Sequence, residues 1–144
     1  MKCSVVILNW NGEAMLRHYL PSVLTHTQLP EVEVVVADNG STDGSLEYLQ
    51  TQGVRIIVLG QNYGFAEGYN RAIAQVDSEY VVLLNSDVEV TPHWLDKMLE
   101  YMDAHPNVMA AQPKVLSWNS KQEFEAGKRE AICFEHAGAA GGLM

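Results

Sequence analysis

Four apolar runs of strand length, each closed by a group of polar residues, constrain the fold of this chain more than any other feature. The runs cover residues 3–8, 31–37, 54–59 and 80–84. They are rich in β-branched residues, as is typical of strands buried on both faces of a parallel sheet. The intervening segments space apolar residues at helical intervals. Strands that alternate with helices predict βαβ units, so we expect an α/β fold with a mainly parallel central sheet flanked by helices.

The polar groups that close the runs predict a ligand site. They lie at residues 9–11, 38–43, 62–64 and 85–87. A single polar end would mean little, because every strand needs a turn. The carboxyl ends of parallel strands, however, emerge at one edge of the sheet, where open α/β sheets bind their ligands. Four such ends, two of them with carboxylates, therefore predict one shared site.

The acidic composition narrows the choice of ligand. Eighteen acidic residues against nine basic ones give a formal charge of -9, which argues against nucleic acid as a partner. For a phosphate ester beside a carboxylate, the repulsion between unit charges about 4 Å apart is about 4 kcal/mol at an effective dielectric constant of about 20. A phosphate ligand would therefore need a bridging cation or a set of backbone amides.

Asp87 is the residue that we expect to hold such a cation. It follows the fourth run directly, after Asn85 and Ser86. A carboxylate at this position is a hard oxygen donor suited to Mg²⁺ or Mn²⁺. The alternative role, a carboxylate that caps a turn, stays open.

Two further groups have both a ligand interpretation and a structural one. Asp38 closes a buried strand and suits a ribose hydroxyl or a base N–H, whereas residues 41–43 fit either a capped turn or a ligand contact. Gly64 and Gly68 lie at the start of an expected helix, where backbone amides attract phosphate. Their spacing matches neither the dinucleotide-binding nor the P-loop fingerprint, and close helix packing explains Gly68 equally well.

The remaining expectations concern organisation and setting. A chain of 144 residues predicts one domain. We also expect a helix at 92–104 with Thr91 as its N-cap, strands at 88–90, 108–115 and 131–134, and a loop from 117. Cys3 and Cys133 fit no metal spacing and favour a reduced, cytoplasmic setting. No window reaches the 18 apolar residues of a membrane span, which leaves docking on the inner membrane face and self-association open.

Taken together, four motifs resemble the family 2 glycosyltransferases, which have a GT-A fold, and most closely their rhamnosyltransferase-like members. The motifs lie at residues 5–12, 36–45, 62–70 and 84–87, and the resemblance covers most of the chain to about residue 115. The resemblance implies inverting transfer of a sugar from a UDP-, dTDP- or GDP-sugar to a saccharide or lipid-linked acceptor. Synthesis of a cell-surface polysaccharide or glycolipid is the expected setting.

The resemblance also implies roles for individual residues. Nucleotide and diphosphate contacts fall to Asn9, Asn11, Asp38, Gly64 and Asn70. In the family's D-x-D motif, Asp87 is the metal carboxylate. Asn85 takes the first acidic position of that motif, where an amide can still bond ribose but removes one negative charge.

No segment matches the family's catalytic base, an acidic residue in the second half that deprotonates the acceptor hydroxyl. We therefore expect that base beyond Met144, a donor-binding core at 1–116, and the truncated start of an acceptor-side region at 117–144. Two alternatives stay open: a non-catalytic nucleotide-binding or assembly module, and a nucleotidyltransferase. The second usually has a basic loop near its first strand, and residues 9–12 contain no Lys or Arg.

Overall fold

The structure is a computed structural model that describes residues 1–113 and 115. Its contacts divide the chain into two units, Met1–Lys97 and Met98–Met144. The strand expected at 131–134 and the acceptor-side region expected at 117–144 lie outside the described residues. The candidate site belongs to the first unit.

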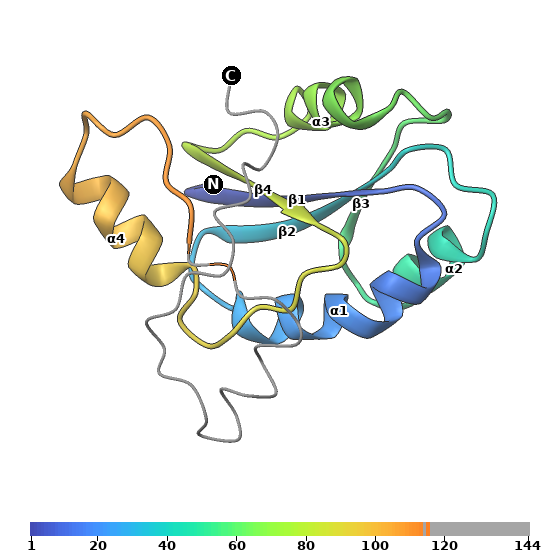
Figure 1. The fold of residues 1–144 in the computed structure, drawn as a ribbon, viewed down its shortest axis with the longest axis horizontal. Coiled ribbons are helices and arrows are strands. Elements are labelled where there is room, and N and C mark those ends of the chain that lie inside the picture. The colour runs from blue at the N-terminus through green and yellow to red at the C-terminus, as the bar shows by residue number, and fades with distance from the viewer. Residues whose placement is uncertain (114, 116–144) are drawn as a thin grey trace. The chain divides into compact units, whose positions relative to one another are not determined.

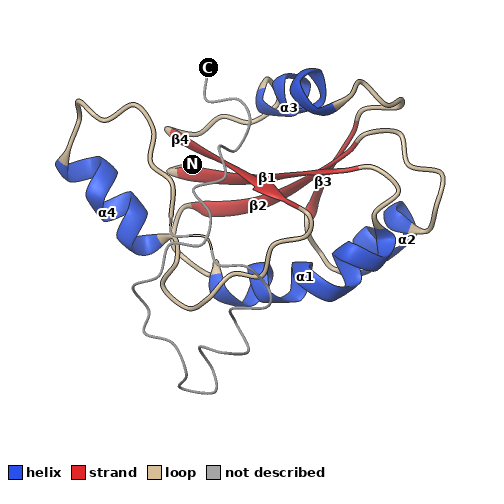
Figure 2. Cartoon of the chain, viewed as in Figure 1, coloured by secondary structure: helices blue, strands red, loops and turns tan. Residues whose placement is uncertain are grey.

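The first unit contains a four-stranded parallel sheet (Figure 2). Its strands are β1 (Cys3–Asn9), β2 (Val32–Asp38), β3 (Arg55–Val58) and β4 (Tyr80–Asn85), in the order β3-β2-β1-β4. The predicted α/β fold with a mainly parallel sheet is confirmed. Three strands run one residue further than predicted, so that Asn9, Asp38 and Asn85 are the last residues of their strands.

Helices cover both faces of this sheet (Figure 1). The helices α1 (Glu13–His26) and α2 (Ser45–Thr51) lie on one face, and α3 (Phe65–Ile73) lies on the other. Alternate strand residues point to opposite faces. The core beneath α3 consists of Val6, Val35, Ala37, Ile57, Tyr69 and Ala72. The sheet is therefore the middle of three layers, between α1 and α2 on one face and α3 on the other.

The helix predicted at 92–104 begins later than expected. The observed helix α4 is Asp96–Ala104, and residues 92–95 form turns. His93 has a φ of 63°, a left-handed conformation that cannot continue a right-handed helix. The prediction that Thr91 caps a helix starting at Pro92 is therefore wrong.

Two predicted strands are also wrong. Residues 88–90 are not a strand, because the chain turns at Ser86 and Asp87 and the amide of Val90 then donates to Ser22 Oγ of α1 at 3.3 Å. No strand is found over residues 108–113 and 115, where Met109 is 97% exposed. Pro113 has no N–H for a sheet ladder. None of the helices within residues 1–113 is both long and apolar enough to cross a membrane.

Candidate functional site

The order of the strands reverses between β1 and β4, and the carboxyl ends of these two strands lie side by side. The chain adds β2 and then β3 on one side of β1, and α3 then leads back to β4 on the other side. Ligands of open α/β sheets bind at such a reversal of strand order. In register, Asn9 pairs with Asp38, and Leu8 pairs with Asn85. Three of the predicted site residues therefore lie at one edge.

Asp38 is fully buried and has partners within the protein for both carboxylate oxygens. Its Oδ1 accepts from Asn9 Nδ2 at 3.2 Å, and its Oδ2 accepts from the Ser41 amide at 2.9 Å. Asn9 Nδ2 also donates to Ser41 Oγ at 3.2 Å. In this structure the carboxylate orients Asn9 and holds the loop after β2. Its contact with a ligand stays a prediction.

Asn9 has one buried acceptor without a partner among the described residues. The residue is 1% exposed, and its Oδ1 finds no hydrogen-bond partner among the described residues. Exchange of its two amide atoms would set an oxygen against the Asp38 carboxylate, so the hydrogen bonds define the orientation. A Cβ on Gly12 would lie 2.5 Å from this Oδ1 and 3.9 Å from Ser86 Oγ. Gly12 thus leaves room beside the acceptor, towards the end of β4.

The loops that follow β1 and β2 are joined through Asn11. Its amide donates to Ser41 Oγ at 2.9 Å, and its Oδ1 accepts from the Thr42 amide at 2.7 Å. A φ of 48° at Asn11 makes this approach possible. Asn11, which is exposed, therefore holds the two loops together at this end of the sheet, and its predicted nucleotide contact stays a prediction.

Asp43 and Glu13 link the starts of α1 and α2 through hydrogen bonds to backbone amides. Asp43 accepts from the first amides of both helices, Glu13 of α1 at 3.0 Å and Ser45 of α2 at 3.0 Å. Glu13 Oε2 accepts from the Gly44 amide at 3.2 Å. Burial raises the pKa of Asp43, but hydrogen bonds from Ser45 and from the Glu13 amide outweigh it and lower the pKa. The N-cap of α2 is Gly44, without a side-chain cap hydrogen bond, so Asp43 holds this turn from the position before the N-cap.

Asn39 was not predicted as a site residue, yet it holds the loop before α3. Asn39 is 2% exposed. Its Nδ2 donates to Asn62 Oδ1 at 3.1 Å and to the Gly64 carbonyl at 3.0 Å. Its Oδ1 accepts from the Tyr63 amide at 3.0 Å. Gly64 is the N-cap of α3, with a φ of 76° that favours glycine. The only sequence signal was an amide placed directly after a buried strand.

Gly68 brings α3 close to β1. A Cβ at this position would lie 2.9 Å from Leu8 Cδ2 and 3.1 Å from Asn39 Nδ2. The packing interpretation of Gly68 therefore has a geometric basis. Asn70, on the same helix, is exposed and has no side-chain hydrogen bond to the other predicted site residues within the described chain.

The end of β4 is tied to α3 through Tyr69. Its hydroxyl donates to the carbonyl of Leu84 at 2.9 Å, and Leu84 is followed by Asn85, the last residue of β4, and by the turn at Ser86 and Asp87. Burial raises the pKa of Tyr69 to about 12, and the negative charge of Asp87 adds to this shift. Asn85 and Asp87 themselves are exposed, so their side chains are accessible to a ligand.

Asp87 remains the carboxylate that we expect to hold the cation. No group of three His, Cys, Asp or Glu side chains within residues 1–113 and 115 could hold a metal ion. Mg²⁺ is commonly bound through one or two carboxylates together with substrate phosphates. Asp87 fits a site of that kind, in which the ligand's phosphates complete the coordination.

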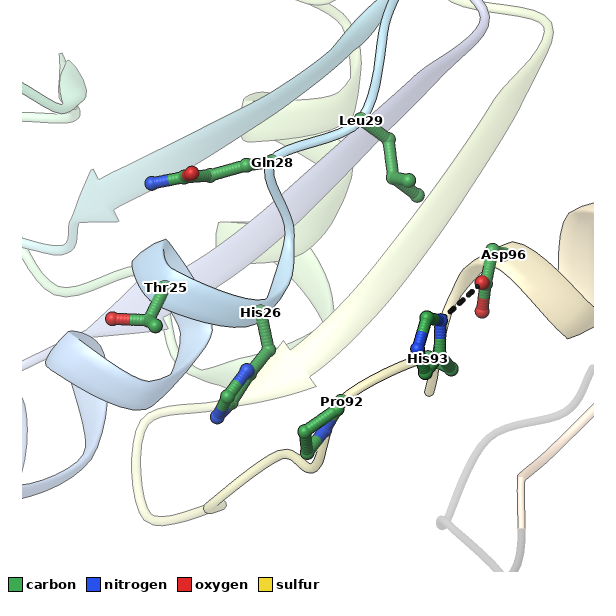
Figure 3. Close-up of a pocket in the computed structure, with 7 residues that line it drawn as sticks. All are labelled: Thr25, His26, Gln28, Leu29, Pro92, His93 and Asp96. Atoms are coloured by element: carbon green, nitrogen blue, oxygen red, sulfur yellow. Dashed lines mark hydrogen bonds and ion pairs between the residues drawn. The ribbon is translucent and has the colours of Figure 1, made fainter.

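A separate hollow of about 280 Å³ lies where α1 ends and the chain approaches α4 (Figure 3). In it, His93 Nδ1 lies 2.8 Å from Asp96 Oδ2. The other lining residues are Thr25, His26, Gln28, Leu29 and Pro92. They precede β2 or follow the β4 turn, so this hollow lies away from the carboxyl ends of the strands and is not the predicted site.

Comparisons with known proteins agree with the geometry. Residues 4–136 match the family model described as glycosyl transferase family 2. An N-acetylglucosaminyl-diphospho-decaprenol L-rhamnosyltransferase of Mycobacterium tuberculosis is 30% identical over 124 residues, which cover 77% of this chain and 40% of that protein. The putative teichuronic acid biosynthesis glycosyltransferase TuaG of Bacillus subtilis is 30% identical over 104 residues, which cover 69% of this chain and 41% of that protein.

A solved structure shares the fold. The crystal structure of S. aureus TarS 1-349 in complex with UDP-GlcNAc has a TM-score of 0.66 and 29% identity, and the match covers 74% of this chain and 32% of that one. This chain therefore spans well under half the length of the relatives that it matches.

Proposed function

Because the chain belongs to glycosyl transferase family 2 and has its GT-A fold, we propose that the carboxyl ends of β1 and β4 bind a nucleoside diphosphate sugar. The donor is a UDP-, dTDP- or GDP-sugar. The observation that carries the proposal is the convergence of Asn9, Asp38 and Asn85 at the reversal of strand order. The UDP-GlcNAc complex of TarS supports a nucleotide-sugar donor.

Asn9 and Asp38 are proposed to contact the base or ribose. A buried acceptor without a partner costs about 1 to 3 kcal/mol, so the Asn9 Oδ1 favours a ligand that presents a hydrogen there. The ring N–H of uracil, thymine or guanine and a ribose hydroxyl are such groups. Asp38 orients Asn9 through the 3.2 Å hydrogen bond to its Nδ2. Asn11 and Asn85 would line the same nucleotide pocket.

The diphosphate is proposed to lie by the amino end of α3. The first intrahelical bond of α3 runs from the Gly68 amide to the Gly64 carbonyl at 3.3 Å. The amides of Phe65, Ala66 and Glu67 therefore have no acceptor within the helix. Such amides favour phosphate, and on a chain with a formal charge of -9 they offset the surrounding carboxylates. Gly64 and Asn70 border this position.

Asp87 is proposed to hold Mg²⁺ or Mn²⁺, with the ligand's phosphates as the other donors. Lewis-acid stabilisation of the departing diphosphate is the chemistry that such a cation supplies when bound. The amide of Asn85 lowers the negative charge of this turn by one relative to the family's D-x-D motif, so the site would depend more strongly on the diphosphate itself.

The whole protein is proposed to transfer the sugar with inversion to a saccharide or lipid-linked acceptor. Inverting displacement requires a general base at the acceptor hydroxyl, and no described residue is assigned to that role. The names of the M. tuberculosis rhamnosyltransferase and of TuaG support a role in cell-surface polysaccharide synthesis. The free, buried Cys3 is consistent with a cytoplasmic setting, and a lipid-linked acceptor would place the protein at the inner face of the membrane.

A thermal-shift panel tests this function. The chain is heated with UDP-, dTDP- and GDP-sugars and with nucleoside triphosphates, each with and without MnCl₂. We expect one class of diphosphate sugar to raise the Tm, and to raise it further with Mn²⁺. A rise with triphosphates alone would favour a nucleotidyltransferase, and no rise with any nucleotide would refute the proposed donor site.

A further inference from the structure

One buried side chain connects the end of β2 with the beginning of α3. All three hydrogen bonds of the Asn39 amide go to residues 62–64, and both of its polar atoms take part. Asn62 Oδ1, one of the acceptors, also accepts from the Gly64 amide at 2.8 Å. The amide and carbonyl of Gly64 are thus both fixed by a network that starts from Asn39.

The backbone of the same loops is in close contact. A Cβ on Gly40, which has a φ of 78°, would lie 2.5 Å from Gln61 Cα. Residues 39 and 40 therefore contact successive positions of the loop between β3 and α3. On the other side, a Cβ on Gly68 would lie 3.1 Å from Asn39 Nδ2. Asn39 is enclosed between the loop and the second turn of α3.

We propose that Asn39 is a positioning residue for the donor diphosphate, and this role rests on the proposed function. Asn39 is 2% exposed, and its side chain bonds to residues 62–64. It fixes the place and direction of the Gly64 peptide, from which the amides of Phe65 and Ala66 follow. Amides that are held in place before binding give higher affinity than amides that must be ordered by the ligand. Loss of Asn39 therefore weakens nucleotide binding as well as stability.

The matched substitution is Asn39→Asp, which keeps the size of the side chain. A carboxylate can accept from the Tyr63 amide but cannot donate to Asn62 Oδ1 or to the Gly64 carbonyl. We expect the Kd for UDP with MnCl₂ to rise about tenfold, as for the loss of buried hydrogen bonds that hold a binding loop. Hydrogen exchange of the amides at 63–66 should become faster in the absence of nucleotide.

Two further variants separate positioning from stability. Asn62→Ala removes the shared acceptor from an exposed position and should raise the same Kd about threefold, even if Asn39→Asp fails to fold. Thr27→Val is the control: Thr27 is the C-cap of α1, is 4% exposed, accepts from Trp94 Nε1 at 3.2 Å and lies far from the loop in sequence. It should lower the Tm and leave the Kd unchanged.

The outcomes distinguish this role from the proposed function. If the wild-type chain binds no UDP, the proposed donor site fails, and the positioning role fails with it. If the wild type binds UDP and the folded Asn39→Asp and Asn62→Ala variants bind it as tightly, the donor site stands and the positioning role alone is overturned. A rise in Kd that Thr27→Val reproduces would also overturn it, because general destabilisation would then explain the loss.

Discussion

At the end of β2, the carboxylate of Asp38 lies beside two donors, the Asn9 side chain and the Ser41 amide. Asp38→Asn would turn an NH₂ group towards one of those donors and leave a buried donor unpaired. We expect the free energy of unfolding to fall by about 1 to 3 kcal/mol. Urea denaturation followed by circular dichroism measures the change.

The control for this substitution is Asp77→Asn, the same change at an exposed residue that precedes β4. It should alter the free energy of unfolding by less than about 0.5 kcal/mol. Equal stability of Asp38→Asn and the wild type would contradict the buried hydrogen-bond network described here.

Glu33 of β2 should make stability depend on pH. Burial raises the pKa of Glu33, but hydrogen bonds from Ser4 and Arg55 and the charge of Arg55 outweigh burial and hold the pKa below its ordinary value of 4.5. The Ser4 Oγ donates to Glu33 Oε1 at 2.6 Å. A carboxylate with a depressed folded pKa stabilises the protein above its unfolded pKa and loses that contribution as the pH falls.

The comparison is between the wild type and Glu33→Gln, with the Tm measured at intervals from about pH 7 to about pH 3. At neutral pH the wild type should have the higher Tm. The difference should shrink as the pH falls through 4.5 and below. A difference that is constant over the whole range would be inconsistent with the lowered pKa.

The residues of the site were predictable to different degrees. Asn9, Asp38 and Asp87 stand at the ends of apolar runs, so their common edge followed from periodicity alone. The structural role of Asn39 could not be predicted in this way, because its hydrogen-bond partners at residues 62–64 lie 23 to 25 positions further along the chain. An asparagine after a strand is a common turn former, and its hydrogen bonds across loops leave no mark on local spacing.

At the scale of elements, α3 depends on two glycines, one at its N-cap and one at its fourth residue. Gly64 has a φ of 76° and a ψ of -171°, a conformation that costs a residue with a side chain about 1 to 3 kcal/mol. Gly64→Ala should therefore lower the Tm and raise the Kd for UDP. Chemical denaturation and calorimetry measure the two effects.

Gly53 provides a matched comparison. It also has a positive φ, 66°, and it follows α2 away from the carboxyl ends of the strands. Gly53→Ala should lower the Tm in the same way and leave UDP affinity unchanged. Loss of affinity in both variants would mean that strain alone, and not the position of α3, explains the effect at Gly64.

The close approach of Gly68 to Leu8 predicts that substitutions at these two positions have coupled effects on the free energy of unfolding. A Cβ at position 68 would lie 2.9 Å from Leu8 Cδ2, so Gly68→Ala should destabilise the fold by about 1 to 3 kcal/mol through overpacking. In a Leu8→Ala background the same substitution should cost less. A double-mutant cycle in urea gives the coupling energy, and strict additivity of the two changes would argue against the close contact.

Element boundaries show where local patterns fail. The Thr91-Pro92 pair fits the start of a helix, yet α4 begins at Asp96. Trp94 instead donates to Thr27 Oγ1 at 3.2 Å, and Leu95 is 1% exposed. These tertiary contacts keep residues 92–95 in turns, and a cap pattern in the sequence contains no information about them.

At the scale of the whole molecule, the direction of the strands was predictable and their order was not. Alternating strands and helices imply a parallel sheet, but the sequence does not state on which side of β1 the chain places β4. The order β3-β2-β1-β4 decides that the end of β1 at Asn9 lies beside the end of β4 at Asn85, which Asp87 follows. The motif order that resembles family 2 glycosyltransferases pointed to the same residues independently of the topology.

The measurement that tests the donor site most directly is calorimetry of a UDP-, dTDP- or GDP-sugar with and without MnCl₂. It is made on the wild type, on Asp87→Ala and on the exposed control Asp77→Ala. The wild type and Asp77→Ala should bind one donor about tenfold more tightly with Mn²⁺, a difference of about 1.4 kcal/mol. Asp87→Ala should bind it with the same affinity in both conditions. Absence of binding to the wild type with and without Mn²⁺, or full Mn²⁺ dependence in Asp87→Ala, would contradict the account.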